Sequence, residues 1–191
     1  TAGFGAQAWL PGISPTMRGA TVSAMAAALR ALHKVASGLP LDASARWAAD
    51  SIRDVADMDA QVRQRVAQLK GSSSRDVAHL LQEIAVALGE VTDRTGEFGR
   101  WVPTLSPSDF GPHNMLHDQT TDAWSLIDLE FFGWDDAHKL ACDTLMHPLI
   151  SWKGDLAGQF LESVVQTYDL DIRRLLALYP WCSLKWATIV A

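Results

Sequence analysis

Three side chains in the middle of the 191-residue sequence have the types and the spacing that phosphoryl transfer requires. Asp109 is followed five residues later by Asn114, and Asp128 lies fourteen residues further on. Phosphoryl transfer needs a group that orients and deprotonates an attacking hydroxyl, and oxygen ligands that hold magnesium against the phosphate. Asp109 suits the hydroxyl, whereas the amide oxygen of Asn114 and the carboxylate of Asp128 suit the metal. Asp and Asn are also ordinary turn residues, but Asn114 is the only asparagine in the chain.

A short hairpin would bring these three residues together. Residues 115–116 and 124–127 are apolar and flank the polar stretch 117–122, a pattern typical of two strands joined by a turn. Folding the second strand back on the first predicts that Asp128 lies beside Asn114. Residues far apart in the sequence would then share one site.

The sequence of this region resembles a known family. Asp109-Phe-Gly-Pro-His-Asn114, followed by Leu-Ile-Asp128-Leu-Glu130, is similar to the catalytic loop and the metal-binding aspartate of the aminoglycoside phosphotransferase and choline kinase family, small-molecule relatives of protein kinases. The resemblance implies an ATP- and Mg²⁺-dependent phosphotransferase that acts on a hydroxyl of an aminoglycoside, choline or sugar-like molecule. One position departs from the family, which usually has a histidine two residues before the catalytic aspartate, where this chain has Pro107.

The same resemblance implies the fold class. We expect a mainly α structure with a small β-hairpin, corresponding to the C-terminal lobe of a protein-kinase-like fold with the N-terminal lobe missing. On this interpretation residues 1–12 are a hinge remnant and residues 21–100 are the helical part. Residues 101–136 are the catalytic loop and metal-binding hairpin, and residues 137–191 are the C-terminal helices.

Apolar periodicity and helix-ending residues predict several helices, whose role would be to hold the catalytic loop. None of them carries candidate catalytic residues. Pro180 is expected to bend or interrupt the last one. The predicted helices cover residues 21–37, 42–70, 76–92, 154–168 and 169–179.

The beginning of the chain resembles the hinge between the two lobes of the family. If the match holds, Ala8, Trp9 and Leu10 lie at the edge of the adenine ring; the alternative is a surface turn at residues 11–12. A glycine-rich loop and a strand lysine, which an N-terminal lobe would supply, are not found before this point. We therefore expect the N-terminal lobe to be a missing partner and the chain to have weak or no activity alone.

Acidic residues after the hairpin allow two interpretations. Glu130, Asp135 and Asp136 could bind a second magnesium ion or a substrate ammonium group, or could cap a helix, for which aspartate is favoured. Asp143 lies among apolar residues, and the resemblance implies that it braces the catalytic loop through hydrogen bonds.

Histidines in the second half suggest a metal site, but their spacing does not support one. No two of them have the helical spacing expected of a zinc-binding pair, so structural or incidental roles are favoured. His113 is the exception to test because it adjoins Asn114. The histidines concerned are His113, His117, His138 and His147.

Composition limits the partners. Residues 1–100 contain 11 basic and 10 acidic side chains, whereas residues 101–191 contain 5 and 12. Nucleic acid is therefore a poor partner, and magnesium with a cationic or neutral polyol substrate is a better one. The sequence has no long apolar run that would cross a membrane and no signal-like start, and its two cysteines are compatible with a reducing cytoplasm.

Two other functions are compatible with these residues. Pro107 and the missing lobe favour a non-catalytic binding or scaffold module that has kept the lobe. A metal-dependent phosphohydrolase could use the same carboxylates together with His113 or His117.

Overall fold

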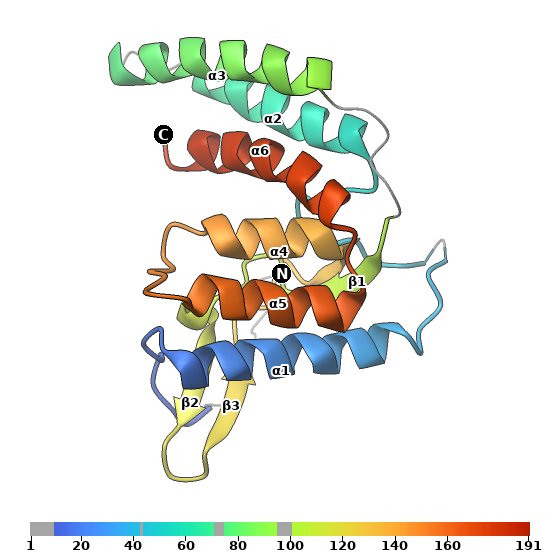
Figure 1. Ribbon diagram of the computed structural model, residues 1–191, viewed down its shortest axis with the longest axis vertical. Helices are drawn as coiled ribbons and strands as arrows, with labels where there is room; N and C mark the ends of the chain where they lie inside the picture. The colour runs from blue at the N-terminus through green and yellow to red at the C-terminus, as the bar shows by residue number, and fades with distance from the viewer. Residues whose placement is uncertain (1–9, 43, 71–74, 95–100) are drawn as a thin grey trace, which may run out of the picture.

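A computed structural model describes residues 10–42, 44–70, 75–94 and 101–191. Within those ranges the chain is mainly helical, with two small antiparallel sheets of two strands each, as expected from the sequence (Figure 1). The helices are α1 (Gly19–Ala36), α2 (Val55–Leu69), α3 (Arg75–Arg94), the short 3-10 helix η1 (Pro112–Asn114), α4 (Ala137–Met146), α5 (Leu156–Tyr168) and α6 (Ile172–Ile189). The strands are β1 (Pro103–Ser106), β2 (Met115–Asp118), β3 (Ala123–Leu126) and β4 (Gly133–Asp136).

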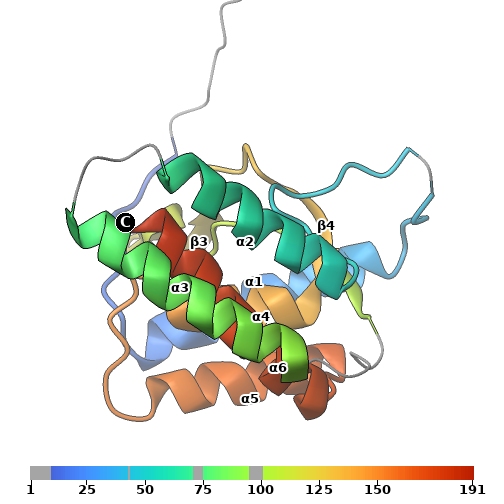
Figure 2. The ribbon, with the colours of Figure 1, turned by 90° about the horizontal axis from the view of Figure 1, so that it is seen from above.

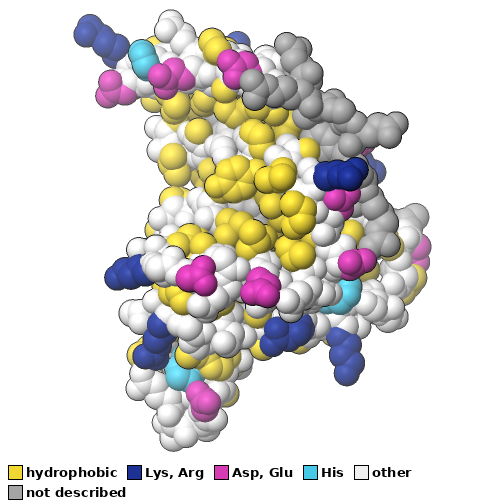
Figure 3. Space-filling model, in the orientation of Figure 1, with side chains coloured by type: hydrophobic (Ala, Val, Ile, Leu, Met, Phe, Trp, Pro, Cys, Tyr) yellow, Lys and Arg dark blue, Asp and Glu magenta, His cyan; other side chains and the backbone are white. Residues whose placement is uncertain are grey.

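Helix α6 is central to the helical packing. It lies between the α2–α3 pair and α4, and it contacts all three of these helices, while α5 packs against α1 (Figures 1 and 2). Apolar side chains gather over the middle of the face in Figure 3, and most charged side chains lie around them. The apolar interior includes Met25, Ile52, Phe160 and Trp181, all fully buried.

Helix α6 continues through Pro180, so the predicted interruption there is wrong. Proline removes one backbone hydrogen bond, in this case the bond to the carbonyl of Leu176. Leu176 is exposed, so water can reach the carbonyl that loses its partner. Leu178 and Trp181, on either side of the proline, are fully buried, and their packing stabilises the helix across it.

The prediction of one helix over residues 42–70 is correct only for its second half. Helix α2 begins at Val55, and Asp54 caps it by accepting a hydrogen bond of 3.0 Å from the backbone N–H of Asp57. Before the cap, residues 44–54 are not helical. Propensity favoured a longer helix, but tertiary contacts give this segment other hydrogen-bond partners.

Those partners lie on β4. The N–H of Ala48 donates to the carbonyl of Trp134 at 3.0 Å, and the N–H of Trp134 donates to the carbonyl of Arg46 at 2.8 Å. The approach requires a glycine at position 133, because a Cβ there would lie 2.4 Å from the backbone nitrogen of Ala48. The segment before α2 is thereby fixed beside the strand that leads into α4.

The hairpin of β2 and β3 was predicted, whereas the sheet of β1 and β4 was not. In the hairpin Met115 is opposite Leu126. In the other sheet Thr104 is opposite Asp135, and its two strands are separated in sequence by the whole catalytic loop and hairpin. This pairing anchors both ends of the segment that contains Asp109 and Asp128. No helix in the described part of the chain is long and apolar enough to span a bilayer.

Candidate active site

Asp109 lies in a tight loop that follows β1. The preceding residue, Ser108, has a φ of 70°, in the left-handed region that residues other than glycine rarely adopt. Two hydrogen bonds hold this conformation: the Ser108 N–H donates to Ser106 Oγ at 3.0 Å, and Ser108 Oγ donates to the carbonyl of Ala49 at 2.9 Å. The local backbone is therefore fixed by both its own strand and the segment before α2.

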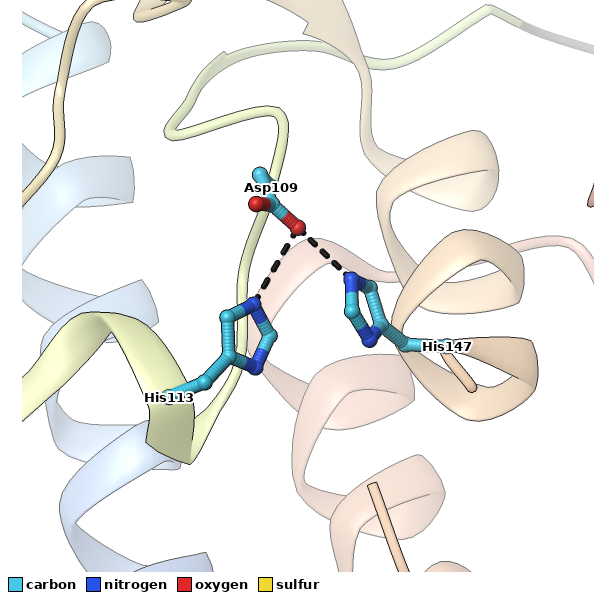
Figure 4. Close-up of side chains that lie close together, drawn as sticks. All are labelled: Asp109, His113 and His147. Atoms are coloured by element: carbon cyan, nitrogen blue, oxygen red, sulfur yellow. Dashed lines mark hydrogen bonds and ion pairs between the residues drawn. The ribbon is translucent and has the colours of Figure 1, made fainter. Parts of the chain in front are cut away.

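Two histidines meet the carboxylate of Asp109 on one oxygen. His147 Nε2 lies 2.7 Å and His113 Nε2 lies 3.2 Å from Oδ1, as Figure 4 shows. The two rings are stacked, with centroids 4.3 Å apart. Asn114 Nδ2 donates to the second oxygen, Oδ2, at 3.1 Å and to the Asp109 carbonyl at 2.9 Å. A carboxylate has about four acceptor positions, so these contacts leave one position on Oδ2 for a ligand.

The proton on His147 can be assigned from its second nitrogen. The backbone N–H of Leu149 donates to His147 Nδ1 at 3.2 Å, so this nitrogen is an acceptor. In a neutral imidazole the proton then lies on Nε2, which donates it to Asp109. Burial lowers the pKa of His147, and the neighbouring His113 lowers it further. The ring is therefore a neutral hydrogen-bond donor near pH 7.

The same contacts set the charge of Asp109. Partial burial acts to raise the pKa of its carboxyl, but the hydrogen bonds and charges of His113 and His147 outweigh burial, and the pKa is lowered. Its side chain remains 39% exposed. Asp109 is thus an ionised carboxylate that is held from one side and open on the other.

Asp109, His113 and His147 form a group that could hold a metal ion, since their ligand atoms lie within 4.8 Å of one another. Irregular spacing in the sequence gave no reason to expect this grouping. Metal binding through His147 Nε2 would, however, require the proton to move to Nδ1, which already accepts the Leu149 N–H. The hydrogen bonds therefore favour a role for the two histidines in orienting Asp109.

Asn114 and Asp128 are brought together by the predicted hairpin. The backbone N–H of Ile127 donates to the carbonyl of Asn114 at 3.0 Å, and Asp128 is the next residue. Asp128 is exposed and has a φ of 56°, a left-handed conformation that turns the chain directly after this pair. Because Asn114 uses its amide nitrogen to hold Asp109, its amide oxygen is the atom available to a cation.

Asp135 and Asp136 do not face a cavity, so the prediction that they contact substrate is wrong. Both are completely buried. Asp135 accepts hydrogen bonds from Lys139 Nζ at 2.7 Å and from the N–H of Ile52 at 3.0 Å. Asp136 caps α4 and accepts from Arg174 Nε at 3.0 Å. Of the two interpretations of the sequence, the capping one is correct for Asp136, whereas Glu130 is exposed and its role as a ligand stays a prediction.

Asp143 has partners other than those that the resemblance implied. Its Oδ2 lies 2.6 Å from Lys185 Nζ and 3.0 Å from Lys139 Nζ, and the three side chains are buried. Burial acts to raise the pKa of Asp143, but the two lysines lower it to about 2. This network joins α4 to α6, while the catalytic loop is braced by His147, the residue that follows α4.

The hinge prediction concerns the start of the chain. Ala8 and Trp9 lie outside the described residues, so their proposed contact with adenine stays a prediction. Leu10 is described and exposed.

A cavity of about 570 Å³ opens beside Asp109, and we call it the Asp109 cavity. This is within the usual size of small-molecule sites. Sequence patterns missed most of its wall, because the wall is assembled from separate elements and no local motif marks it. The cavity is lined by Ala49, Asp50, Arg65, Ser108, Asp109, Phe131, His147, Pro148, Leu149, Lys185, Trp186 and Ile189.

Neither a family model nor a curated protein sequence matches the chain. Solved structures do match its fold. An aminoglycoside-3'-phosphotransferase of type VIII superposes with a TM-score of 0.51 and 21% identity, over 86% of this chain and 60% of that chain. An aminoglycoside phosphotransferase of Streptomyces rimosus, APH(3'')-Id, superposes with a TM-score of 0.50 and 18% identity, over 87% of this chain and 61% of that one. This chain has an aminoglycoside phosphotransferase-like fold.

The aminoglycoside phosphotransferase-like chain spans about 60% of the length of the solved structures that it matches. The resemblance of the segment from Asp109 to Glu130 is thereby confirmed at the level of the fold. At identities of 18% and 21% the structural match carries no substrate with it.

Proposed function

We propose that the chain carries the phosphoryl-transfer residues of an ATP- and Mg²⁺-dependent kinase that acts on a hydroxyl of a small molecule. One observation carries the proposal. Asp109 is held through Oδ1 by two histidines and keeps one acceptor position on Oδ2, at the edge of a cavity large enough for a small substrate. The aminoglycoside phosphotransferase-like fold supports this reaction class by analogy.

Asp109 orients the substrate hydroxyl and accepts its proton. A lowered pKa keeps this carboxylate ionised but makes it a weak base. In a loose phosphoryl-transfer transition state the hydroxyl proton leaves late, so positioning matters more than basicity. Held by His113, His147 and Asn114, Asp109 can meet the hydroxyl without rearranging.

Asn114 and Asp128 are the residues that would hold magnesium. Both offer the oxygen ligands that Mg²⁺ prefers, and they adjoin a backbone hydrogen bond at the end of the hairpin. Bound Mg²⁺-ATP supplies the phosphoryl group and neutralises its charge. Asn114 therefore has two roles, because its amide nitrogen fixes Asp109 and its amide oxygen faces the cation.

The proposal is tested by an ATP-consumption screen of sugars, amino alcohols and aminoglycosides, followed by Asp109→Asn on any substrate found. Removal of a general base lowers kcat by about 10²- to 10⁴-fold, and we expect a loss in that range. Asp118→Asn is the matched control, because Asp118 lies on the hairpin and its carboxylate accepts only local bonds from Thr120 and Thr121. A substrate that is turned over equally well by Asp109→Asn would contradict the assignment.

Pro107 supports a second candidate, a binding module without catalysis, because the family's usual histidine is missing there. His147 reaches the catalytic carboxylate from α4 and can take over its orientation, which favours the enzyme. Binding of Mg²⁺-nucleotide without turnover of any hydroxyl compound would favour the module.

A further inference from the structure

The Asp109 cavity has a wall whose chemistry indicates the kind of acceptor. We propose that it takes an uncharged hydroxyl compound with a flat or aliphatic apolar face, and that it disfavours polyamines such as aminoglycosides. The inference rests on the proposed function for the role of the cavity, but the binding preference can be measured without catalysis.

Charged groups on the wall already have partners within the protein. The carboxylate of Asp50 forms an ion pair with Arg65 Nη2, and Asp109 accepts from two histidines. Lys185, which also reaches the cavity, is paired with Asp143 at 2.6 Å. A polyamine would lose hydration on entering, and both carboxylates of the described wall are already engaged by other groups.

Trp186 offers an aromatic surface that is unfavourable to a second cation. Lys185 Nζ lies over its ring, 5.4 Å from the centroid, and already occupies a cation–π position. An ammonium group that approached the same ring would be repelled by this lysine at short range. An uncharged flat group has no such penalty.

Large apolar side chains are exposed around the cavity. Leu149 is 70% exposed, Phe131 45% and Ile189 41%. They come from three separate parts of the chain and line the same cavity. Apolar side chains that gather around a cavity, rather than singly on a surface, mark a binding site for an apolar group.

The overall charge of the second half pointed towards a cationic substrate, but its acids are not at the cavity. Asp135, Asp136 and Asp143 are buried in ion pairs with lysines and an arginine. Their charge is therefore neutralised inside the protein. What remains beside the cavity is Asp109, which suits one hydroxyl.

Isothermal titration of the 191-residue chain with three probes tests the inference. The probes are phenyl β-D-glucopyranoside, glucose and kanamycin A, in the absence of nucleotide. We expect phenyl glucoside to bind at least about tenfold more tightly than either of the others, the effect of burying one apolar face. Tighter or equal binding of kanamycin A, or binding of none of the probes, would overturn the inference.

A matched pair of variants locates the binding. Leu149→Ala should weaken phenyl glucoside by about tenfold, whereas Val86→Ala, which removes an equally exposed side chain from α3 outside the cavity wall, should leave it unchanged. Equal effects of the two variants would also overturn the inference. Because no turnover is measured, a failure of the proposed kinase reaction would appear separately, in the ATP-consumption screen.

Discussion

His147 Nε2 donates a hydrogen bond of 2.7 Å to Asp109 Oδ1, although 38 residues separate them. His147 follows the C-terminal end of α4, and Asp109 lies in the loop after β1. The N–H of Leu149 fixes the tautomer that makes this donation possible. Through this contact the packing of α4 against the catalytic loop sets the orientation of the proposed base.

If His147 orients Asp109, its removal should affect turnover more than nucleotide binding. For His147→Ala we expect kcat to fall by about 10- to 100-fold, because misplacing a catalytic group by about 1 Å can cost that much. The KM for ATP should change little, and His147→Gln should recover part of kcat, since its amide can donate a hydrogen bond. Steady-state kinetics measure both quantities.

The control for this experiment is His79→Ala, because His79 is exposed on α3 and lies far from the loop in sequence. It should leave kcat unchanged. A His147→Ala variant with normal kcat, or one whose loss appears only in KM, would refute the orienting role.

The titration of His147 should make stability depend on pH. Burial lowers its pKa in the folded state below the ordinary value of 6.5. The folded protein then binds fewer protons than the unfolded chain, so this contribution to the free energy of unfolding is complete above pH 6.5 and falls as the pH drops towards the folded pKa. The lowered pKa of Asp109 acts in the same direction, but only below its ordinary value of 3.8.

Urea denaturation between about pH 5 and pH 8 measures this effect. His147→Gln should show a smaller fall in the free energy of unfolding below pH 6.5 than the unaltered chain. An identical pH dependence in both proteins would show that other groups are responsible.

Two aspartates of the hairpin region provide a matched test of the magnesium site. Asp122 and Asp128 are both exposed and both left-handed, with φ values of 57° and 56°, and asparagine tolerates this conformation well. Asp128→Asn should weaken Mg²⁺-ATP by about tenfold or more, since a carboxylate ligand is lost. Asp122→Asn should bind as the unaltered chain does. Titration calorimetry with Mg²⁺-ATP would exclude the proposed role of Asp128 if both variants bound equally.

Lys139 is expected to be important for stability and not for direct contact with substrate. Burial acts to lower its pKa, but Asp135 and Asp143 raise it well above its ordinary value, so it stays charged. Lys139→Met would leave these two buried carboxylates with fewer partners and should cost about 3–5 kcal/mol in the free energy of unfolding. Arg63→Ala removes an exposed ion pair with Asp59 and should cost at most about 1 kcal/mol. Denaturant titrations that gave similar losses would contradict the difference between buried and exposed pairs.

Local sequence was sufficient for those parts of the molecule whose partners are close in the chain. The hairpin of β2 and β3 could be predicted because both strands and their turn lie within residues 115–127. Helices α1 and α3 followed from apolar periodicity, and the proximity of Asn114 and Asp128 followed from the hairpin. In each case the pattern that determines the structure is short and continuous.

Tertiary structure decided everything that depends on long-range packing. No spacing indicates that His147 meets Asp109, that residues 44–54 pair with β4 instead of extending α2, or that Asp135 and Asp136 are buried among basic side chains. A short sequence pattern specifies local hydrogen bonds and an apolar face, but not which other element that face will meet. The sequence alone therefore identified a candidate base and its metal ligands, whereas only the packing of α4 and α6 around the loop determined how that base is held and what surrounds it.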